Sequence, residues 1–119
     1  MDTKLLGAMG EAYTAAFFRK KNYKILAMNY RTRLGEIDLI AAKRKTLVFV
    51  EVKLRRSGGL TRAADAVSQA KQRKLRASAE IWLNQNPSYA GWAMSFTVAE
   101  IYVSEGGEVE AFELLENAF

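Results

Sequence analysis

Acidic and basic side chains cluster in two short strand-like stretches in the first half of the chain. Residues 35–40 read GEIDLI, and Glu51-Val52-Lys53 begins thirteen residues after Asp38. The polar segment 43–46 between them predicts a hairpin in which the numbers of opposed residues sum to 89. Asp38 then faces Glu51 and Glu36 faces Lys53. Because side chains alternate along a strand, all four charges are predicted to share one face.

These residue types suit metal-assisted chemistry at a phosphate. Asp38 and Glu51 supply the oxygen ligands that Mg²⁺ or Mn²⁺ prefers, and the carbonyl of Val52 could supply another. The Lys53 amine could hold or deprotonate a water, or neutralise charge that develops on a phosphate. Glu11, from a predicted first helix, and Lys71, from a second, could reach the same site.

Each of these residues also has an ordinary structural explanation. The hairpin charges could form cross-strand ion pairs on a solvated face, while Ile37, Leu39, Val50 and Val52 form a core wall on the other. Glu11 could face solvent, and Lys71 could extend past the edge of the core. For Trp82 and Trp92, a place in the core is favoured over a role in base stacking.

The composition limits the chemistry further. The chain has 119 residues, which is typical of one domain over 1–119, and it contains neither cysteine nor histidine. Thiol nucleophiles, imidazole bases and thiolate or imidazole metal ligands are therefore excluded. The sequence contains no apolar run long enough to span a bilayer. We expect a cytoplasmic protein that does not enter a membrane.

Charge is distributed unevenly along the chain. All 18 lysines and arginines lie at or before Arg76, where six acids leave a net charge of +12, whereas residues 77–119 carry −7. A basic region attracts polyanions, and we expect a nucleic-acid partner, with DNA favoured. The candidate contacts are polar or basic residues near the second helix: Arg55, Arg56, Arg62, Lys71, Gln72, Arg73 and Lys74.

Hydrophobic periodicity predicts the elements around the site. We expect a helix over 3–21, a strand over 23–31, the hairpin 35–53, a loop over 55–62, a helix over 64–85, and strands over 92–104 and 109–115. The second helix can return the chain so that the next strand joins the sheet in parallel. The fold class is therefore α/β, a central mixed sheet of about five strands flanked by helices in the order α-β-β-β-α-β-β.

Several of these motifs, in this order, resemble the YraN family of small bacterial proteins. The resemblance rests on Gly10-Glu11, Asn29-Tyr30-Arg31, residues 35–40, residues 48–55 and residues 71–75. That family resembles the restriction-endonuclease-like superfamily, which includes archaeal Holliday junction resolvases. The resemblance implies a three-layer restriction-endonuclease-like core and a metal-dependent endonuclease, with branched or damaged DNA as candidate substrates.

Carried over by position, the resemblance assigns roles to single residues. Asp38 and Glu51 correspond to metal ligands, Lys53 to the catalytic lysine, Glu11 to a helical glutamate, and Lys71 and Gln72 to a pair on the second helix. One departure is clear: Ser95-Phe96-Thr97 stands where the family usually has Arg-Phe-Asp. A module that binds nucleic acid or protein without cutting is therefore the alternative hypothesis. A homodimer is compatible with either.

Overall fold

The computed structural model describes residues 3–56 and 67–119, and its elements follow the predicted order. They are α1 (Thr3–Lys20), β1 (Lys24–Thr32), β2 (Gly35–Lys43), β3 (Thr46–Arg56), α2 (Gln69–Gln85), the short 3-10 helix η2 (Pro87–Tyr89), β4 (Ala93–Val103) and β5 (Val109–Leu115). Within this part of the chain, all the strands form one sheet in the order β1-β2-β3-β4-β5. β3 and β4 are parallel and the other neighbours are antiparallel, which confirms the predicted mixed α/β sheet.

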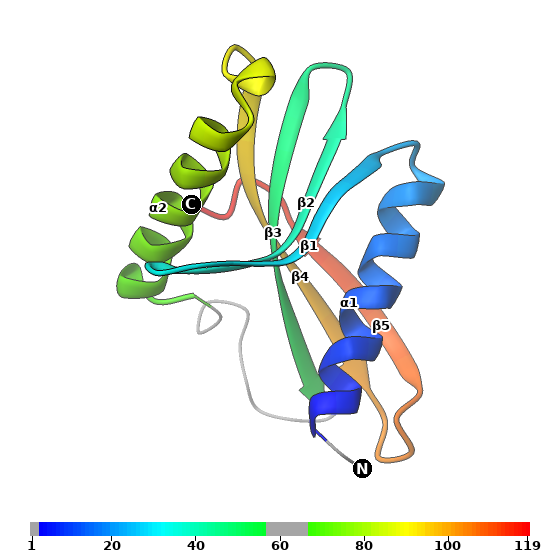
Figure 1. The fold of residues 1–119 in the computed structure, drawn as a ribbon. Helices are drawn as coiled ribbons and strands as arrows, with labels where there is room; N and C mark the ends of the chain where they lie inside the picture. Colours follow the sequence, from blue (N-terminus) through cyan, green and yellow to red (C-terminus); the bar gives the residue numbers. More distant parts are fainter. Residues whose placement is uncertain (1–2, 57–66) are drawn as a thin grey trace.

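The two helices cover opposite faces of the sheet (Figure 1). Under α2, Ile40 and Phe49 pack against Leu75 and Trp82. Under α1, a second cluster joins Val50 of the sheet to Phe18 of the helix. The hairpin is therefore not a ribbon with one core face and one charged face, as the sequence suggested. Ile37–Ala42 are all buried, because helices cover the strand on both sides.

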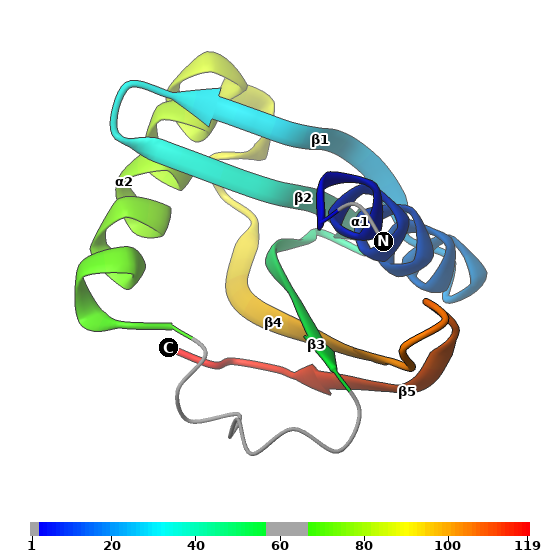
Figure 2. The ribbon, with the colours of Figure 1, turned by 90° about the horizontal axis from the view of Figure 1, so that it is seen from below.

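The β1–β2 turn reaches α2 at one end of the sheet. The Thr32 and Ser78 hydroxyls lie 3.0 Å apart, and a methyl group added at Gly35 would meet Lys74 Cβ at 3.1 Å. Figure 2 shows how the twisted sheet places β1 and β2 at one edge and β5 at the other. The turn thus ties the first hairpin to the helix that carries Lys71.

Most element boundaries agree with the sequence predictions, with two corrections. Helix α2 begins at Gln69 rather than at 64, since Ser68 precedes it as N-cap and its hydroxyl accepts the N–H of Lys71 at 3.2 Å. Strand β3 continues to Arg56, so Arg55 and Arg56 belong to the strand and not to a loop. The rest of the predicted loop, including Arg62, lies outside the described residues.

No helix in the described ranges is long and apolar enough to cross a membrane.

Candidate active site

The two central carboxylates lie side by side where β2 and β3 begin to separate. The ladder between these strands runs from Lys43 opposite Thr46 to Leu39 opposite Val50, and every pair in it sums to 89, as the sequence predicts. Asp38 and Glu51 follow the last pair and are 7% and 5% exposed. Asp38 Oδ2 accepts the N–H of Val52 at 2.8 Å, a bond that joins the diverging strands.

Two lysines approach the same oxygen of Glu51. The Lys71 amine of α2 lies 2.6 Å from Glu51 Oε1, and the Lys53 amine of β3 lies 3.8 Å from it. Of the alternatives for Lys71, the structure supports entry into the site. Gln72, its neighbour, instead donates a hydrogen bond to the carbonyl of Val67 at 3.3 Å.

Burial and neighbouring charges shift the pKa values of three of these groups, most of all that of Asp38. Burial, followed by repulsion from Glu51, raises the pKa of Asp38 to about 7, although the N–H of Val52 acts in the opposite direction. The pKa of Lys53 is lowered, first by burial and then by the charge of Lys71. Burial alone would also lower the pKa of Lys71, but its hydrogen bond to Glu51 and the negative charges of Glu51 and Asp38 together outweigh burial and raise it. Strong perturbation by burial and charged neighbours is typical of functional sites.

Glu11 lies within electrostatic reach of the pair without joining it. Its negative charge contributes to the raised pKa of Asp38. Gly10, the preceding residue, allows α1 to approach the sheet, because an added methyl group would lie 3.3–3.5 Å from Ile101, Leu54 and Val52. Close packing of helix against sheet therefore accounts for a glycine at position 10. Gly7 has nothing within 4 Å, so close packing does not account for the glycine there.

Glu36 does not face Lys53 as the extrapolated register predicts. The β2–β3 ladder ends at Leu39, and the outer part of β2 pairs with β1 alone, where Glu36 is opposite Arg31. Its carboxylate lies 3.4 Å from Arg31 Nε, and both side chains are largely exposed. The predicted face of four charges is therefore wrong at Glu36.

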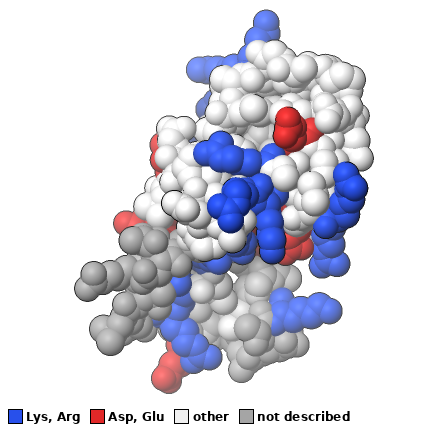
Figure 3. Space-filling model, turned by 90° about the vertical axis from the view of Figure 1, so that its left-hand side faces the viewer, with Lys and Arg blue, Asp and Glu red and all other residues white. Residues whose placement is uncertain are grey.

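The basic residues near the site have different surroundings. Arg73, Lys74 and Arg56 are exposed, and Figure 3 shows lysines and arginines gathered on the side of the molecule that carries α2. Arg55 is instead largely buried, with its Nε 3.5 Å from Glu100 Oε2. Exposed cations on and near α2 form a surface that a phosphate backbone can contact.

Sequence reasoning missed Glu100 of β4. Its side chain is fully buried, and it accepts a hydrogen bond from the Tyr102 hydroxyl at 2.8 Å. Three atoms of this cluster are buried without a hydrogen-bond partner: Nε and Nη2 of Arg55 and Oε1 of Glu100. A lone acid within the apolar run Phe96 to Val103 was the available signal.

The donor set suits a magnesium-like ion that keeps waters or substrate oxygens. Within 3–56 and 67–119, no group of three or more acidic, histidine or cysteine side chains could hold a metal. A cation at this site would depend on Asp38, Glu51 and a backbone carbonyl such as that of Val52. Mg²⁺ commonly binds through one or two carboxylates plus water and phosphate oxygens, so the residues fit this mode.

Fold and site together define an α/β protein whose mixed sheet carries a buried pair of acids flanked by lysines. The chain belongs to Uncharacterised protein family UPF0102, whose model matches residues 10–102. This membership confirms the expected YraN-like family of small bacterial proteins.

Relatives of this family match nearly the whole chain. A UPF0102 protein of Caldicellulosiruptor saccharolyticus is 39% identical over 119 residues, covering 100% of both chains. One of Alkaliphilus oremlandii is 40% identical over 117 residues, covering 98% of each. One of Mesorhizobium japonicum is 43% identical over 95 residues, covering 80% of this chain and 74% of its own. The match to the Caldicellulosiruptor saccharolyticus protein spans the whole chain and so includes every element around Asp38 and Glu51.

Proposed function

We propose that this protein is a metal-dependent nuclease that hydrolyses phosphodiester bonds of DNA, with branched or damaged DNA as candidate substrates. The observation that carries the proposal is the burial of Asp38 beside Glu51, with Asp38 protonated up to about pH 7. Two buried carboxylates repel each other, and a divalent cation would neutralise both. The strand order and the position of Lys53 also match what the resemblance to restriction-endonuclease-like proteins implies.

In this proposal one oxygen of each carboxylate contacts the protein and the other would hold the metal. The contacts above engage Asp38 Oδ2 and Glu51 Oε1, and we assign the other oxygen of each carboxylate to Mg²⁺ or Mn²⁺. A bound ion of this kind polarises a phosphoryl oxygen and lowers the pKa of water. Glu11 is assigned to outer support of the ion, through charge, because no third acid of the described residues is placed to share a metal with Asp38 and Glu51.

Lys53 and Lys71 would provide proton transfer and charge balance at the site. Lys53 has a lowered pKa and lies at the edge of the pair, so its amine can accept the proton of the attacking water or stabilise charge at the phosphate. Lys71 balances the negative charge of Glu51. Arg56, Arg73 and Lys74 would hold flanking phosphates. Glu100 would orient the guanidinium of Arg55.

A cleavage assay tests this proposal. Supercoiled plasmid and branched DNA are incubated with Mg²⁺, Mn²⁺ or a chelator, and with wild type, Asp38→Ala, Lys53→Ala and Glu36→Gln. Wild type and the exposed-acid control Glu36→Gln should cut only with metal, while each site variant should lose at least about a hundredfold in rate. Equal cutting by all four proteins would contradict the proposal.

One observation favours the alternative, a binding module that does not cut. Lys71 already places an ammonium 2.6 Å from Glu51 and can replace part of the charge that a metal would bring. Salt-sensitive DNA binding with no cleavage under any divalent ion would favour that function. Homodimerisation stays a prediction.

A further inference from the structure

A second group of cations lies at the end of the sheet that carries the β2–β3 turn, away from Asp38 and Glu51 in the middle of these strands. It comprises the last turn of α1, the start of β1 and the β2–β3 turn, and we call it the basic end: Arg19, Lys20, Lys21, Lys24, Lys43, Arg44 and Lys45. Residues 19–24, 43–46 and 86–92 contain no acid. Among the described residues, none of these seven cations forms an ion pair with a carboxylate. This end therefore has a concentrated positive charge that the site chemistry does not use.

The turn that carries two of these cations is conformationally costly. Arg44 and Lys45 both have positive φ, 49° and 62°, as a two-residue hairpin turn with the favoured twist requires. Asparagine and glycine accept these angles at low cost, whereas long side chains do not. Strained residues that persist in a turn point to a use for their side chains. Here the property that these side chains supply is positive charge at an exposed tip.

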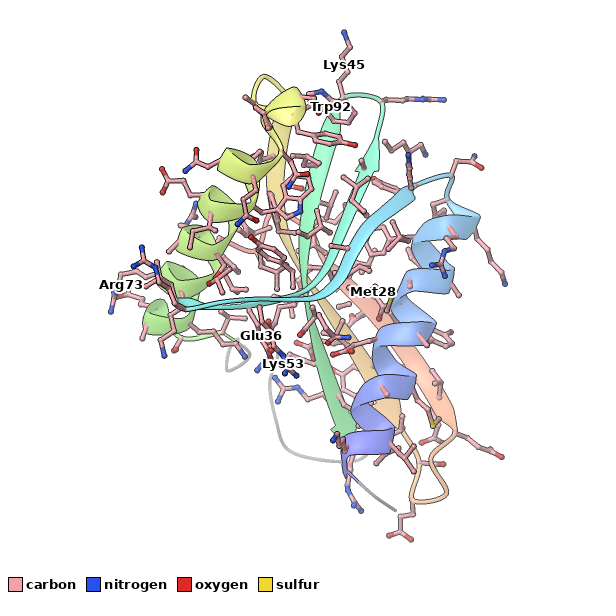
Figure 4. All side chains as sticks on the ribbon, in the orientation of Figure 1. Met28, Glu36, Lys45, Lys53, Arg73 and Trp92 are labelled. Atoms are coloured by element: carbon pink, nitrogen blue, oxygen red, sulfur yellow. The ribbon has the colours of Figure 1, made fainter. Side chains whose placement is uncertain are left out.

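Half-buried aromatic rings lie directly beside this turn. The carbonyl of Lys45 accepts the N–H of Ala93 at 3.1 Å, which places Trp92 next to the tip. A hollow of about 450 Å³ is lined by both Arg44 and Trp92, and by Tyr89, whose ring centroid lies 4.8 Å from that of Trp92. Figure 4 shows Lys45 projecting from the tip above Trp92, at the far end of the molecule from Lys53. Trp82 is 5% exposed in the core, as predicted, whereas Trp92 packs against that core and is only partly buried.

We propose that the basic end is a second nucleic-acid-binding site, which takes a single-stranded segment with its phosphates on Arg44 and Lys45 and a base against Trp92. Cations alone suit any polyanion. A neighbouring aromatic ring favours nucleic acid, because bases stack on such rings without regard to sequence. Five to six strand residues separate this end from Asp38, on the order of 20 Å. The site is independent of whether the Asp38 pair cuts DNA.

The strained turn provides a variant that separates binding from folding. Arg44→Asn with Lys45→Gly gives the preferred residues for this turn, so we expect a melting temperature higher by a few degrees. Binding of an oligothymidylate of about eight nucleotides, measured in a chelator, should nonetheless weaken by roughly tenfold. The slope of log affinity against log salt should fall by about 1.4, for two lost phosphate contacts.

Tryptophan fluorescence reports directly on the contact between a base and Trp92. Oligothymidylate should quench the emission of wild type, and Trp92→Phe, which retains only the buried Trp82, should bind without this response. The matched control, Arg44→Lys with Lys45→Arg, preserves both charges and should bind like wild type. Unchanged affinity in the Asn-Gly variant, unchanged Trp92 emission at saturation, or weak binding by the charge-preserving control would each overturn the proposal. So would binding of phosphatidylglycerol vesicles without binding of the oligonucleotide.

Discussion

At the scale of single residues, the contact between Lys71 and Glu51 stabilises the buried negative charge of Glu51 when no metal is bound. A hydrogen bond to a charged group contributes about 1.5–3 kcal/mol, and Lys71 is partly solvated, so we expect the lower part of that range. Lys71→Met should therefore lower the free energy of unfolding by about 1–2 kcal/mol in a chelator.

Urea denaturation measures this loss, with Arg73→Met on the exposed side of the same helix as the control. Figure 4 shows Arg73 pointing away from the sheet, so its replacement should stay within about 0.5 kcal/mol of wild type. Divalent metal should restore part of the stability that Lys71→Met loses. Equal stability of the two variants would show that the Lys71 contact does not stabilise Glu51.

Asp38 predicts how stability depends on pH. Its pKa is about 7 in the folded protein and near 3.8 in the unfolded chain. Between these values the folded state binds more protons, so the stability contributed by Asp38 is complete below about pH 4 and is lost as pH rises to about 7. The loss cannot exceed about 1.4 kcal/mol per pH unit.

The measurement compares wild type with Asp38→Asn, which preserves an oxygen to accept the N–H of Val52. Across this pH range in a chelator, the free energy of unfolding of wild type should fall relative to that of the variant. Parallel curves would contradict the raised pKa. Saturating Mg²⁺ should reduce the difference, because the metal stabilises the ionised carboxylate.

At the scale of elements, the approach of the β1–β2 turn to α2 depends on Gly35. Its φ is +156°, and an added methyl group would meet Lys74 Cβ at 3.1 Å and Ser78 Oγ at 3.3 Å. Gly35→Ala should lower the free energy of unfolding by about 1–3 kcal/mol, because turn and helix must separate. Gly91→Ala is the matched control, since nothing lies within 4 Å of that position.

Denaturant midpoints, compared at an unchanged slope of free energy against denaturant concentration, measure the stability of both glycine variants. A displaced turn would also change the position of α2 and hence of Lys71. Gly35→Ala should therefore raise the metal concentration needed for cleavage as well. A variant as stable as Gly91→Ala would show that the turn does not require close contact with the helix.

The elements themselves were largely predictable from sequence, and the exceptions have physical causes. Alternation and turn residues located the strands to within about one residue, except that β3 ends at Arg56, three residues beyond the predicted hairpin. The predicted helix start at 64 failed because apolar periodicity continued upstream of Ser68, whose hydroxyl caps the helix. The sequence was interpreted as a strand with alternating buried and exposed residues, but Ile37–Ala42 are all buried. An apolar run between turns also indicates a strand that is covered on both faces.

The sequence predicted the site correctly only for residues close to the β2–β3 turn, where the turn fixes the pairing register. The symmetric turn placed Asp38 beside Glu51 correctly, because few residues intervene. The same register failed for Glu36, because twist separates the strands beyond Leu39. The contact of Lys71 with Glu51 depends on the docking of α2, and a sequence does not specify such a long-range arrangement. The sequence thus left two alternatives open for Lys71, and the role of Glu100 was missed.

At the scale of the whole molecule, the sheet carries two basic regions of different kinds. Around α2, exposed cations adjoin a buried acid pair, while the basic end combines strained cationic turn residues with accessible aromatic rings. A nucleic acid held at both would lie along the strands. Of the seven acids in residues 77–119, Glu80 lies on α2 and Glu100 is buried beside Arg55, while the other five follow β4, in or next to β5 at the other edge of the sheet.

The central claim is that Asp38 and Glu51 bind a divalent metal, and calorimetric titration with Mn²⁺ tests it most directly. Wild type and Glu36→Gln should bind one ion per chain. Below pH 7 binding should release protons, because the ion displaces the proton of Asp38. Glu51→Gln should lose this binding. Mn²⁺ affinity and proton release in Glu51→Gln equal to those of wild type would contradict the account.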